Sequence, residues 1–362
     1  MIRLLVVDDS ALMRRLLGGV FGGEPDFEVA FARDGMEALD AIARQRPDVV
    51  TLDVQMPRMD GLSCLDRIML ENPVPVVMLS ALTAAGAEAT LEALRLGAVD
   101  FVGKPSGVAS LSIDELAPVL VEKVRAAAGA RLRRSHRLAE RVRLRTGLAS
   151  VPGRVPTVPA LPRAAPARPS GTPPGVVLVG CSTGGPAALD ALLEPLPADF
   201  PWPVVIAQHM PASFTGPLAR RLDRLCALSV EEVVRPVPLL PGHAYVGRGD
   251  ADVILGTRAA GIVAMAAPSD PGRRWHPSVD RMVESAMEHV APSRLVGVLM
   301  TGMGNDGAAA MARLHRDGGH TIAEAEESAV VWGMPGELVR AGGAAIVAPL
   351  DGIAAALTGL VA

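Results

Sequence analysis

The stretch Val179-Gly-Cys-Ser-Thr-Gly-Gly-Pro-Ala187 lies between an apolar run, residues 176–179, and a helix-like segment, residues 187–196. Such a turn holds either a phosphate or a nucleophile. A P-loop needs a lysine after its last glycine, where Pro186 stands, and a dinucleotide turn needs G-x-G-x-x-G, which residues 181–183 interrupt. The remaining pattern, G-x-S-x-G, presents Ser182 on a sharp strand-to-helix turn. An ordinary glycine-rich turn is the alternative interpretation.

The region around this turn has the pattern of an α/β domain. Strand candidates at residues 176–179, 204–207 and 296–300 are each followed by a turn marked by glycine or proline and then by a helix-like run. Alternation of this kind predicts a doubly wound parallel sheet covered by helices.

A second alternating region precedes it. Short apolar runs at residues 4–7, 28–31, 49–52, 76–79 and 100–102 alternate with amphipathic segments at 10–20, 35–44, 61–70 and 87–96. This pattern predicts a small doubly wound α/β domain.

The chain is long enough for two domains, since it has 362 residues. We expect the first at residues 1–120 and the second at 174–362. Residues 121–173 should form a linker, helical and rich in arginine at residues 131–145, then extended and rich in proline. The arginine run is interpreted either as a solvated helix face or as a patch for an acidic partner or nucleic acid.

Composition narrows the function further. A net charge of -4 and an aromatic content of 3% give no general attraction to nucleic acid. The three cysteines have no metal-binding spacing, and the N-terminal apolar run is too short for a signal peptide. No apolar run approaches the roughly 20 residues of a membrane span. We therefore expect a cytoplasmic protein without membrane insertion or nucleic-acid binding.

Acidic residues follow two strands of the predicted first domain. Asp8 and Asp9 follow the first strand and Asp53 follows the third, so all three should meet at one edge of the sheet. Carboxylates so close together need a hard cation, and Mg²⁺ suits an all-oxygen site. Ser80 and Lys104 follow two further strands, where a hydroxyl and a cation can meet phosphate oxygens. An acidic pair that merely caps a helix is the alternative.

The segments Val7-Asp-Asp-Ser10, Leu52-Asp53 through Asp60-Gly61 and Lys104-Pro105 resemble two-component receiver domains, which have a flavodoxin-like (βα)5 fold. The resemblance implies that Asp53 accepts a phosphoryl group from a partner histidine kinase. It further implies that Asp8 and Asp9 position Mg²⁺ and that Ser80 and Lys104 contact the new phosphoryl group. Gln55 stands where an acid is usual, and its backbone carbonyl can still bind the metal.

If Ser182 is a nucleophile, it needs a base and an orienting acid. His209 follows the strand candidate at residues 204–207, and Asp306 follows the one at 296–300, so both should share the sheet edge of Ser182. The order Ser, His, Asp argues against the α/β-hydrolase fold but not against a triad. The other histidines weighed as bases are His243, before a strand, and His320, which follows Asp306, with His289 and His315 on helix-like segments.

The glycines around Asp306 also suggest a site. Gly302, Gly304 and Gly307 allow backbone amides to approach a substrate and stabilise an oxyanion. The alternative is a plain helix-entry loop, because Asn305 and Asp306 are both good capping residues.

Five motifs together resemble the chemotaxis protein-glutamate methylesterase family, CheB. They are Gly180-Cys-Ser-Thr-Gly-Gly185, Gln208-His-Met-Pro211, Leu240-Pro-Gly-His-Ala-Tyr245, Pro277-Ser-Val-Asp280 and Thr301-Gly-Met-Gly-Asn-Asp-Gly307. The similarity runs from about residue 174 to the end of the chain. At residues 275–276, before Pro277, this chain has Trp-His where the family usually has His-Arg.

The resemblance implies that Ser182 attacks the methyl ester of a chemoreceptor glutamate, that His209 moves the proton and that Asp306 orients His209. Backbone near Met303 would bind the oxyanion, and Thr183 joins the catalytic set. Members commonly deamidate receptor glutamines too. The implied partners are methylated chemoreceptor cytoplasmic domains and the chemotaxis histidine kinase, and the esterase half needs no cofactor.

The resemblance also suggests how the halves are coupled: the unmodified receiver covers the esterase crevice, and phosphorylation of Asp53 weakens that contact. Two alternatives stay open at this stage. One is a receiver-controlled serine hydrolase that acts on another ester or amide. The other is a non-catalytic binding module that uses residues 131–145.

Overall fold

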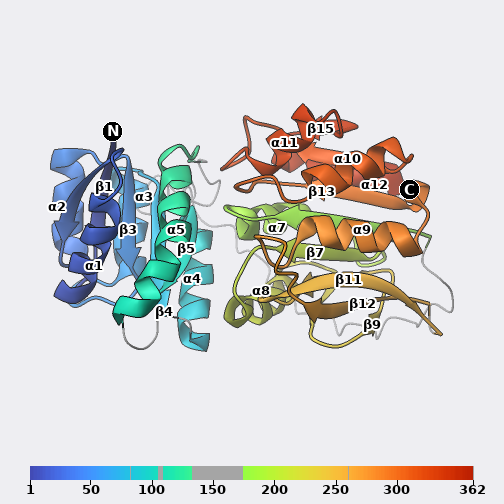
Figure 1. The fold of residues 1–362 in the computed structure, drawn as a ribbon, viewed down its shortest axis with the longest axis horizontal. Coiled ribbons are helices and arrows are strands. Elements are labelled where there is room, and N and C mark those ends of the chain that lie inside the picture. Colours follow the sequence, from blue (N-terminus) through green and yellow to red (C-terminus); the bar gives the residue numbers. More distant parts are fainter. Residues whose placement is uncertain (82, 105–108, 133–173, 260, 362) are drawn as a thin grey trace, which may run out of the picture.

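The computed structural model describes residues 1–81, 83–104, 109–132, 174–259 and 261–361. They form two α/β halves (Figure 1), each with a parallel sheet between layers of helices. The predicted α/β class is therefore confirmed for both halves. Most of the arginine-rich segment and the proline-rich tether, residues 133–173, lie outside the described residues.

The first half has the strand order β2-β1-β3-β4-β5, the flavodoxin-like order, and all its neighbouring strands are parallel. The strands are β1 (Ile2–Val7), β2 (Phe27–Ala32), β3 (Val49–Asp53), β4 (Val76–Ala81) and β5 (Asp100–Lys104). The helices are α1 (Ala11–Gly22), α2 (Gly35–Gln45), α3 (Gly61–Glu71), α4 (Ala84–Leu96) and α5 (Ala109–Ala128).

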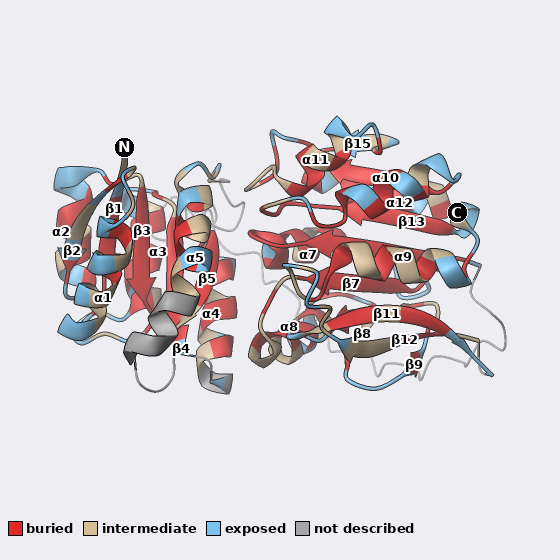
Figure 2. Cartoon of the chain, viewed as in Figure 1, coloured by how far each residue is buried: buried red, intermediate tan, exposed pale blue. Residues whose placement is uncertain are grey.

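Both faces of this sheet are covered, which explains the apolar runs in its strands. In β1, Leu4 and Val6 pack in one cluster with buried side chains of α1 and α5. Leu5 and Val7 point to the other face and share a cluster with α2, α3 and α4. Figure 2 shows the result, with buried strands between half-exposed helices.

Helix α5 continues past the expected domain boundary at residue 120. Leu120, Val124 and Ala127 are buried in the cluster that covers the first sheet. This burial holds the helix on the sheet as far as Ala128. The segment 121–128, expected in the linker, is thus packed as the last element of the first half.

The second half has a parallel sheet in the order β15-β14-β13-β6-β7-β10-β8. Its strands are β6 (Val176–Cys181), β7 (Val204–Gln208), β8 (Ser229–Val233), β10 (His243–Gly247), β13 (Leu295–Leu299), β14 (His320–Glu324) and β15 (Ile346–Ala348). From β6 the chain moves first to β7 on one side and later to β13 on the other. The carboxyl ends of β6, β7 and β13 thus surround a topological switch point, where α/β sheets bind ligands.

The helices of the second half are α7 (Gly185–Leu193), α8 (Ala212–Leu225), α9 (Val279–His289), α10 (Ala308–Arg316), α11 (Met334–Arg340) and α12 (Leu350–Val361). Buried residues of α7, α8 and α12 cluster with Val177 and Val179 of β6. Those of α9, α10 and α11 cluster with Val176 and Leu178, on the opposite face. None of the described helices combines the length and apolar character needed to cross a bilayer.

A small antiparallel sheet joins the α9 face, which the strand pattern did not predict. It consists of β9 (Val237–Pro238), β11 (Ala251–Arg258) and β12 (Gly261–Pro268), in the order β11-β12-β9. Val253 and Leu255 of β11 are buried in the α9 cluster. The segment after β12 leads directly into α9 and so reaches the carboxyl edge of the large sheet.

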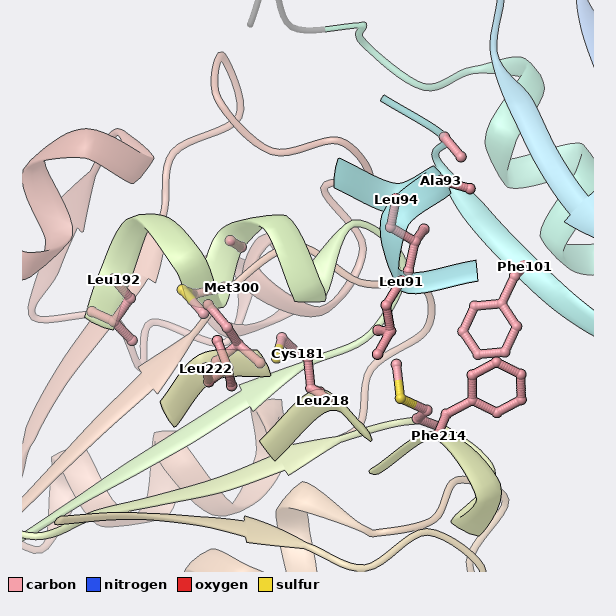
Figure 3. Close-up of a cluster of buried hydrophobic side chains, with 14 of the residues drawn as sticks. Leu91, Ala93, Leu94, Phe101, Cys181, Leu192, Phe214, Leu218, Leu222 and Met300 are labelled. Atoms are coloured by element: carbon pink, nitrogen blue, oxygen red, sulfur yellow. The ribbon is translucent and has the colours of Figure 1, made fainter. Parts of the chain in front are cut away.

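The two halves meet in a continuous apolar contact (Figure 3). Leu91 and Leu94 of α4 and Phe101 of β5 share one buried cluster with Phe214 and Leu218 of α8. The rings of Phe101 and Phe214 have centroids 4.3 Å apart. Full burial of a large apolar side chain contributes roughly 1.5–3 kcal/mol, so this contact favours a docked arrangement of the halves.

Candidate active site

The first half carries an acidic site at the carboxyl edge of its sheet. Asp8 and Asp9 follow β1 and Asp53 ends β3. One carboxylate oxygen of each lies within 4.8 Å of the others, with Asp8 and Asp53 buried and Asp9 exposed. The structure thus brings the three predicted acids together.

Lys104, at the end of β5, is the cation of this site. Its Nζ lies 2.8 Å from Asp8 Oδ2 and 2.8 Å from Asp53 Oδ2. Burial raises the pKa of the Asp53 carboxyl, although Lys104 acts in the opposite direction. One lysine does not balance three carboxylates, and the all-oxygen donor set fits a hard divalent cation such as Mg²⁺.

The other two predicted residues of this site lie around it. Ser80, in β4, is buried and its hydroxyl donates to the carbonyl of Gly86 at 3.2 Å. Gln55 is exposed, and its backbone N–H donates to Asp53 Oδ1 at 3.4 Å. Ser80 directly follows Leu79, which pairs with Asp53 across the sheet, so both Ser80 and Gln55 lie at the carboxyl edge near the acids, and neither adds charge there.

In the second half, Ser182 stands on the turn between β6 and α7. Gly184 has a φ of 78°, in the left-handed region that favours glycine. A Cβ at Gly185 would lie 1.9 Å from Gln208 Oε1, so the turn also needs a glycine there for lack of space. The Ser182 amide donates to Thr301 O at 3.0 Å, which ties the turn to the loop after β13.

His209 and Asp306 meet beside this turn. His209 follows β7, Asp306 lies in the loop before α10, and His209 Nε2 lies 2.8 Å from Asp306 Oδ2. His209 Nδ1 is buried and has no hydrogen-bond partner among the described residues. Asp306 thus fixes one ring nitrogen, and the other is left to serve as a base.

Asp306 is an unusually well-satisfied carboxylate. It accepts hydrogen bonds from Ser278 Oγ at 3.0 Å, from Val279 N at 2.7 Å and from Asp280 N at 3.1 Å, all at the start of α9. Burial would raise the pKa of Asp306, but the bonds from His209 and from these amides outweigh it and lower the pKa. Asp306 therefore stays ionised and able to orient a histidine.

The loop of Asp306 borders the nucleophile turn. A Cβ at Gly302 would lie 2.8 Å from the Cβ of Ser182, so the two backbones are in close contact. The amide of the next residue, Met303, donates to no acceptor among the described residues. Gly302, by contrast, already donates to Val331 O at 3.0 Å. An N–H group thus remains available near Ser182.

The four other histidines weighed as bases lie away from Ser182, and the side chain of Cys181 is buried in the core of the sheet. His243 and His320 are the first residues of β10 and β14, at the opposite edge of the sheet, and His289 and His315 lie in α9 and α10. Cys181 is buried, its thiol contacts Gln208 Oε1 at 3.1 Å, and burial raises the pKa of that thiol. None of these side chains belongs to the site around Ser182.

Sequence reasoning missed three side chains near the site. Trp275 stacks on His209, the buried Asp252 holds the segment before α9, and the buried Glu324 accepts from Thr301 N at 2.8 Å. Two sequence signals pointed to this region: the Trp-His departure at residues 275–276, to which no role was assigned, and the motif Pro277-Ser-Val-Asp280, which contacts Asp306. Asp252 and Glu324 lie inside ordinary strand patterns and gave none.

The first half reaches this site directly. The hydroxyl of Thr183, next to Ser182, donates to the buried Asp100 of β5, and the amide of Gly184 donates to Val99 O at 3.2 Å. Lys123 of α5 holds the other oxygen of Asp100 at 2.9 Å. Ser182 is only 6% exposed in this arrangement.

Comparisons with known proteins identify a family for each half. Residues 177–357 match the CheB methylesterase family, and residues 4–113 match the response regulator receiver domain. The second half is similar to the crystal structure of the Thermotoga maritima CheB methylesterase catalytic domain, with a TM-score of 0.50 and 37% identity; the match covers 52% of this chain and 98% of that one.

Full-length relatives are more similar in sequence. A protein of Rhodopseudomonas palustris named protein-glutamate methylesterase/protein-glutamine glutaminase 2 is 59% identical, over 99% of this chain and 97% of its own. One of Rhodospirillum rubrum, with the same name and number 3, is 52% identical over 99% and 95%. The chain therefore belongs to the CheB methylesterase family, with a response regulator receiver domain ahead of its catalytic domain.

Proposed function

We propose that this chain is a phosphorylation-controlled hydrolase that removes methyl groups from glutamate methyl esters of chemoreceptors and deamidates receptor glutamines. The observation that carries the proposal is the His209–Asp306 pair beside Ser182, with the second imidazole nitrogen free. The names of the full-length relatives support the choice of substrate.

The reaction needs one nucleophile, one base and one oxyanion donor. The Ser182 oxygen bonds to the ester carbonyl carbon while its proton passes to His209 Nδ1. The amide of Met303 stabilises the negative oxygen, a contribution often worth about 3 kcal/mol per donor. The bond to the methoxy group then breaks, and its oxygen takes the proton from His209 and leaves as methanol.

Water completes the cycle. It attacks the acyl-enzyme carbonyl and gives a proton to His209, and the bond to Ser182 breaks as the serine regains its proton. The receptor then carries a free glutamate. With a glutamine substrate ammonia leaves in place of methanol, and every other step is the same.

The receiver half supplies the control. Asp53 accepts a phosphoryl group from a phosphohistidine of the chemotaxis kinase, and Lys104 and Ser80 contact the new group; the present ion pair of Lys104 with Asp53 supports the role of the lysine. Asp8, Asp9, Asp53 and the carbonyl of Gln55 would hold Mg²⁺, which neutralises charge on the transferred group. Phosphorylation replaces the -1 carboxylate of Asp53 with an acyl phosphate of about -1.5 to -2 charge beside Lys104, which now bridges Asp8 and Asp53.

In the docked arrangement the receiver restrains the esterase. Asp100 and Val99 bond the residues directly after Ser182, and the contact of Phe101 with Phe214 adds apolar burial. β5 carries both Asp100 and Lys104, so a shift of this strand on phosphorylation reaches the nucleophile turn. A complete switch needs about 5.5 kcal/mol of differential stabilisation, so we expect partial activation.

The proposed substrate determines the cellular location that we expect. Chemoreceptor cytoplasmic domains and their kinase lie in the cytoplasm, which we propose as the location of this protein. The described residues give no reason to add a nucleic-acid partner, and the esterase chemistry above uses no metal.

The test is methanol release from chemoreceptor cytoplasmic fragments that carry radiolabelled methyl esters. The wild-type chain should release labelled methanol, and Ser182→Ala should not. A chain that hydrolyses small esters through Ser182 but leaves methylated receptor untouched would show that the substrate is a different ester.

A further inference from the structure

Trp275 lies against the proposed base. Its ring and that of His209 are nearly parallel, with an interplanar angle of 9° and centroids 5.5 Å apart. On the loop before Asp306, a Cβ at Gly304 would lie 3.2 Å from Trp275 Nε1. Trp275 thus contacts both the histidine and the loop that carries its orienting acid.

The segment that carries Trp275 is anchored by hydrogen bonds to one buried carboxylate. Asp252, fully buried, accepts from His276 Nδ1 at 2.9 Å, from Ser278 N at 2.8 Å and from Arg281 Nη1 at 2.7 Å. It also accepts from Asp270 N at 3.2 Å. Because both ends of the segment are fixed on one carboxylate, the position of Trp275 is set before substrate binds.

The stacked Trp275 ring fixes the plane of the His209 imidazole, which the bond to Asp306 alone does not fix. The bond from His209 Nε2 to Asp306 fixes one atom of the imidazole but leaves rotation about that bond free. A flat partner 5.5 Å away fixes the plane of the ring, and with it the direction of Nδ1. Misplacement of a reacting group by about 1 Å can cost on the order of 10²-fold in rate.

The receiver touches the same stack through Arg274. The guanidinium Cζ lies 4.6 Å from the centre of the Trp275 ring, a cation–π contact. Arg274 also forms an ion pair with Glu122 of receiver helix α5. The Arg274 side chain is 61% exposed, so the docked receiver supplies much of what orders it.

We propose that Trp275 is a positioning residue for His209 and that Glu122, through Arg274, is the contact by which the docked receiver reaches this stack. The proposal rests on the proposed function, since it takes His209 as the base. It assigns a role to one of the two positions at which this chain departs from the family pattern before Pro277.

The positioning role is tested on the full chain with a fluorophosphonate, which labels an activated serine without any receptor. Trp275→Phe keeps a flat ring and should label Ser182 within about threefold of the wild-type rate. Trp275→Leu should label about 10- to 100-fold more slowly, through a lower maximal rate at an unchanged half-saturating concentration. Trp275→Met replaces the Leu variant if that variant does not fold.

Equal rates for the Leu, Phe and wild-type chains would overturn the positioning role, as would an equal loss in both variants. Two control variants show separately whether the proposed function is wrong. If His209→Ala labels as fast as wild type, or Ser182→Ala is still labelled, the proposed triad itself is wrong.

The link to the receiver is tested by fluorescence. The Trp275 emission is the difference between the wild-type and Trp275→Phe spectra, and in the wild type it should shift when beryllium fluoride and Mg²⁺ are added. Glu122→Gln should show the shifted emission without them. Glu326→Gln is the matched control, because its ion pair with Arg131 also joins the halves but does not involve Arg274, the residue that contacts Trp275. An identical emission in the Glu122→Gln, Glu326→Gln and wild-type chains would refute the link.

Discussion

The two halves place a carboxylate at the same point of the same kind of sheet, yet the two carboxylates have opposite properties. Asp53 ends a parallel strand beside Asp8, and burial raises its pKa. Asp306 follows a parallel strand beside the start of α9, and the hydrogen bonds from His209 and from two backbone amides outweigh burial and lower its pKa. The groups that surround each carboxylate, and not the fold that the two halves share, therefore determine its pKa and its chemical role.

The difference explains why one site suits a phosphoryl group and the other an ester. An acid site whose one lysine does not balance three carboxylates gains most from a further cation and from a reaction that consumes a carboxylate as nucleophile. A carboxylate already saturated with donors makes a poor nucleophile, and it holds a histidine in one orientation instead. The predictions below test this contrast, from the largest effect to the smallest.

The largest effect is expected from removing the base. His209→Ala should lower the maximal rate of methanol release on the order of 10⁶-fold, because the nucleophile and base act as a unit. His320→Ala should behave as wild type, since His320 begins β14 at the opposite sheet edge. Loss of activity with His320→Ala alone would place the base elsewhere.

Asp306 should matter less than His209. Asp306→Asn keeps the size of the side chain but removes the negative charge that orients the imidazole, and the expected loss is about 10⁴-fold in maximal rate. Phosphorylation of Asp53, measured as transfer of radiolabelled phosphate from the kinase, should proceed at the wild-type rate in this variant. Loss of both methanol release and Asp53 phosphorylation would show that the variant is unfolded, and not that its catalytic site alone is impaired.

A contact between the halves should have an effect of about one order of magnitude. Phe101→Ala removes the tilted ring contact with Phe214, and an aromatic pair is worth about 0.5–1.5 kcal/mol beyond its burial, so the rate without phosphodonor should rise about 2- to 10-fold. Phe27→Ala is the control, because Phe27 packs on Phe21 inside the receiver. An equal rise in both variants would assign the effect to receiver instability.

The smallest effect is on stability. Burial raises the pKa of Asp280, beside Asp306, to about 6, so the folded chain holds a proton that the unfolded chain releases from about pH 4 upward. The unfolding free energy should therefore fall as pH rises toward 6. Asp280→Asn cannot ionise and should gain on the order of 1 kcal/mol relative to wild type between about pH 4.5 and 7 in urea unfolding. A pH-independent difference between the two proteins would contradict this account.

The sequence predicted both sheets and the residues at their carboxyl edges. Asp8, Asp53, Ser182, His209 and Asp306 each follow an apolar run, and parallel strands bring such positions together by topology.

What the sequence did not predict depends on contacts between distant segments. The anchoring of Ser278 by Asp252 and the stack of Trp275 on His209 join positions 26 and 66 residues apart, and neither leaves a local period in the sequence. The bond from Thr183 to Asp100 crosses between the halves. Only the docked arrangement reveals it.

The most direct test of the account measures methanol release from methylated receptor by the full chain, with and without a small phosphodonor and Mg²⁺. We expect the rate of the wild-type chain to rise with the phosphodonor and the rate of Asp53→Asn to stay at its starting value. A wild-type rate that the phosphodonor leaves unchanged, although Asp53 is shown to be phosphorylated, would contradict the claim that the receiver controls the esterase.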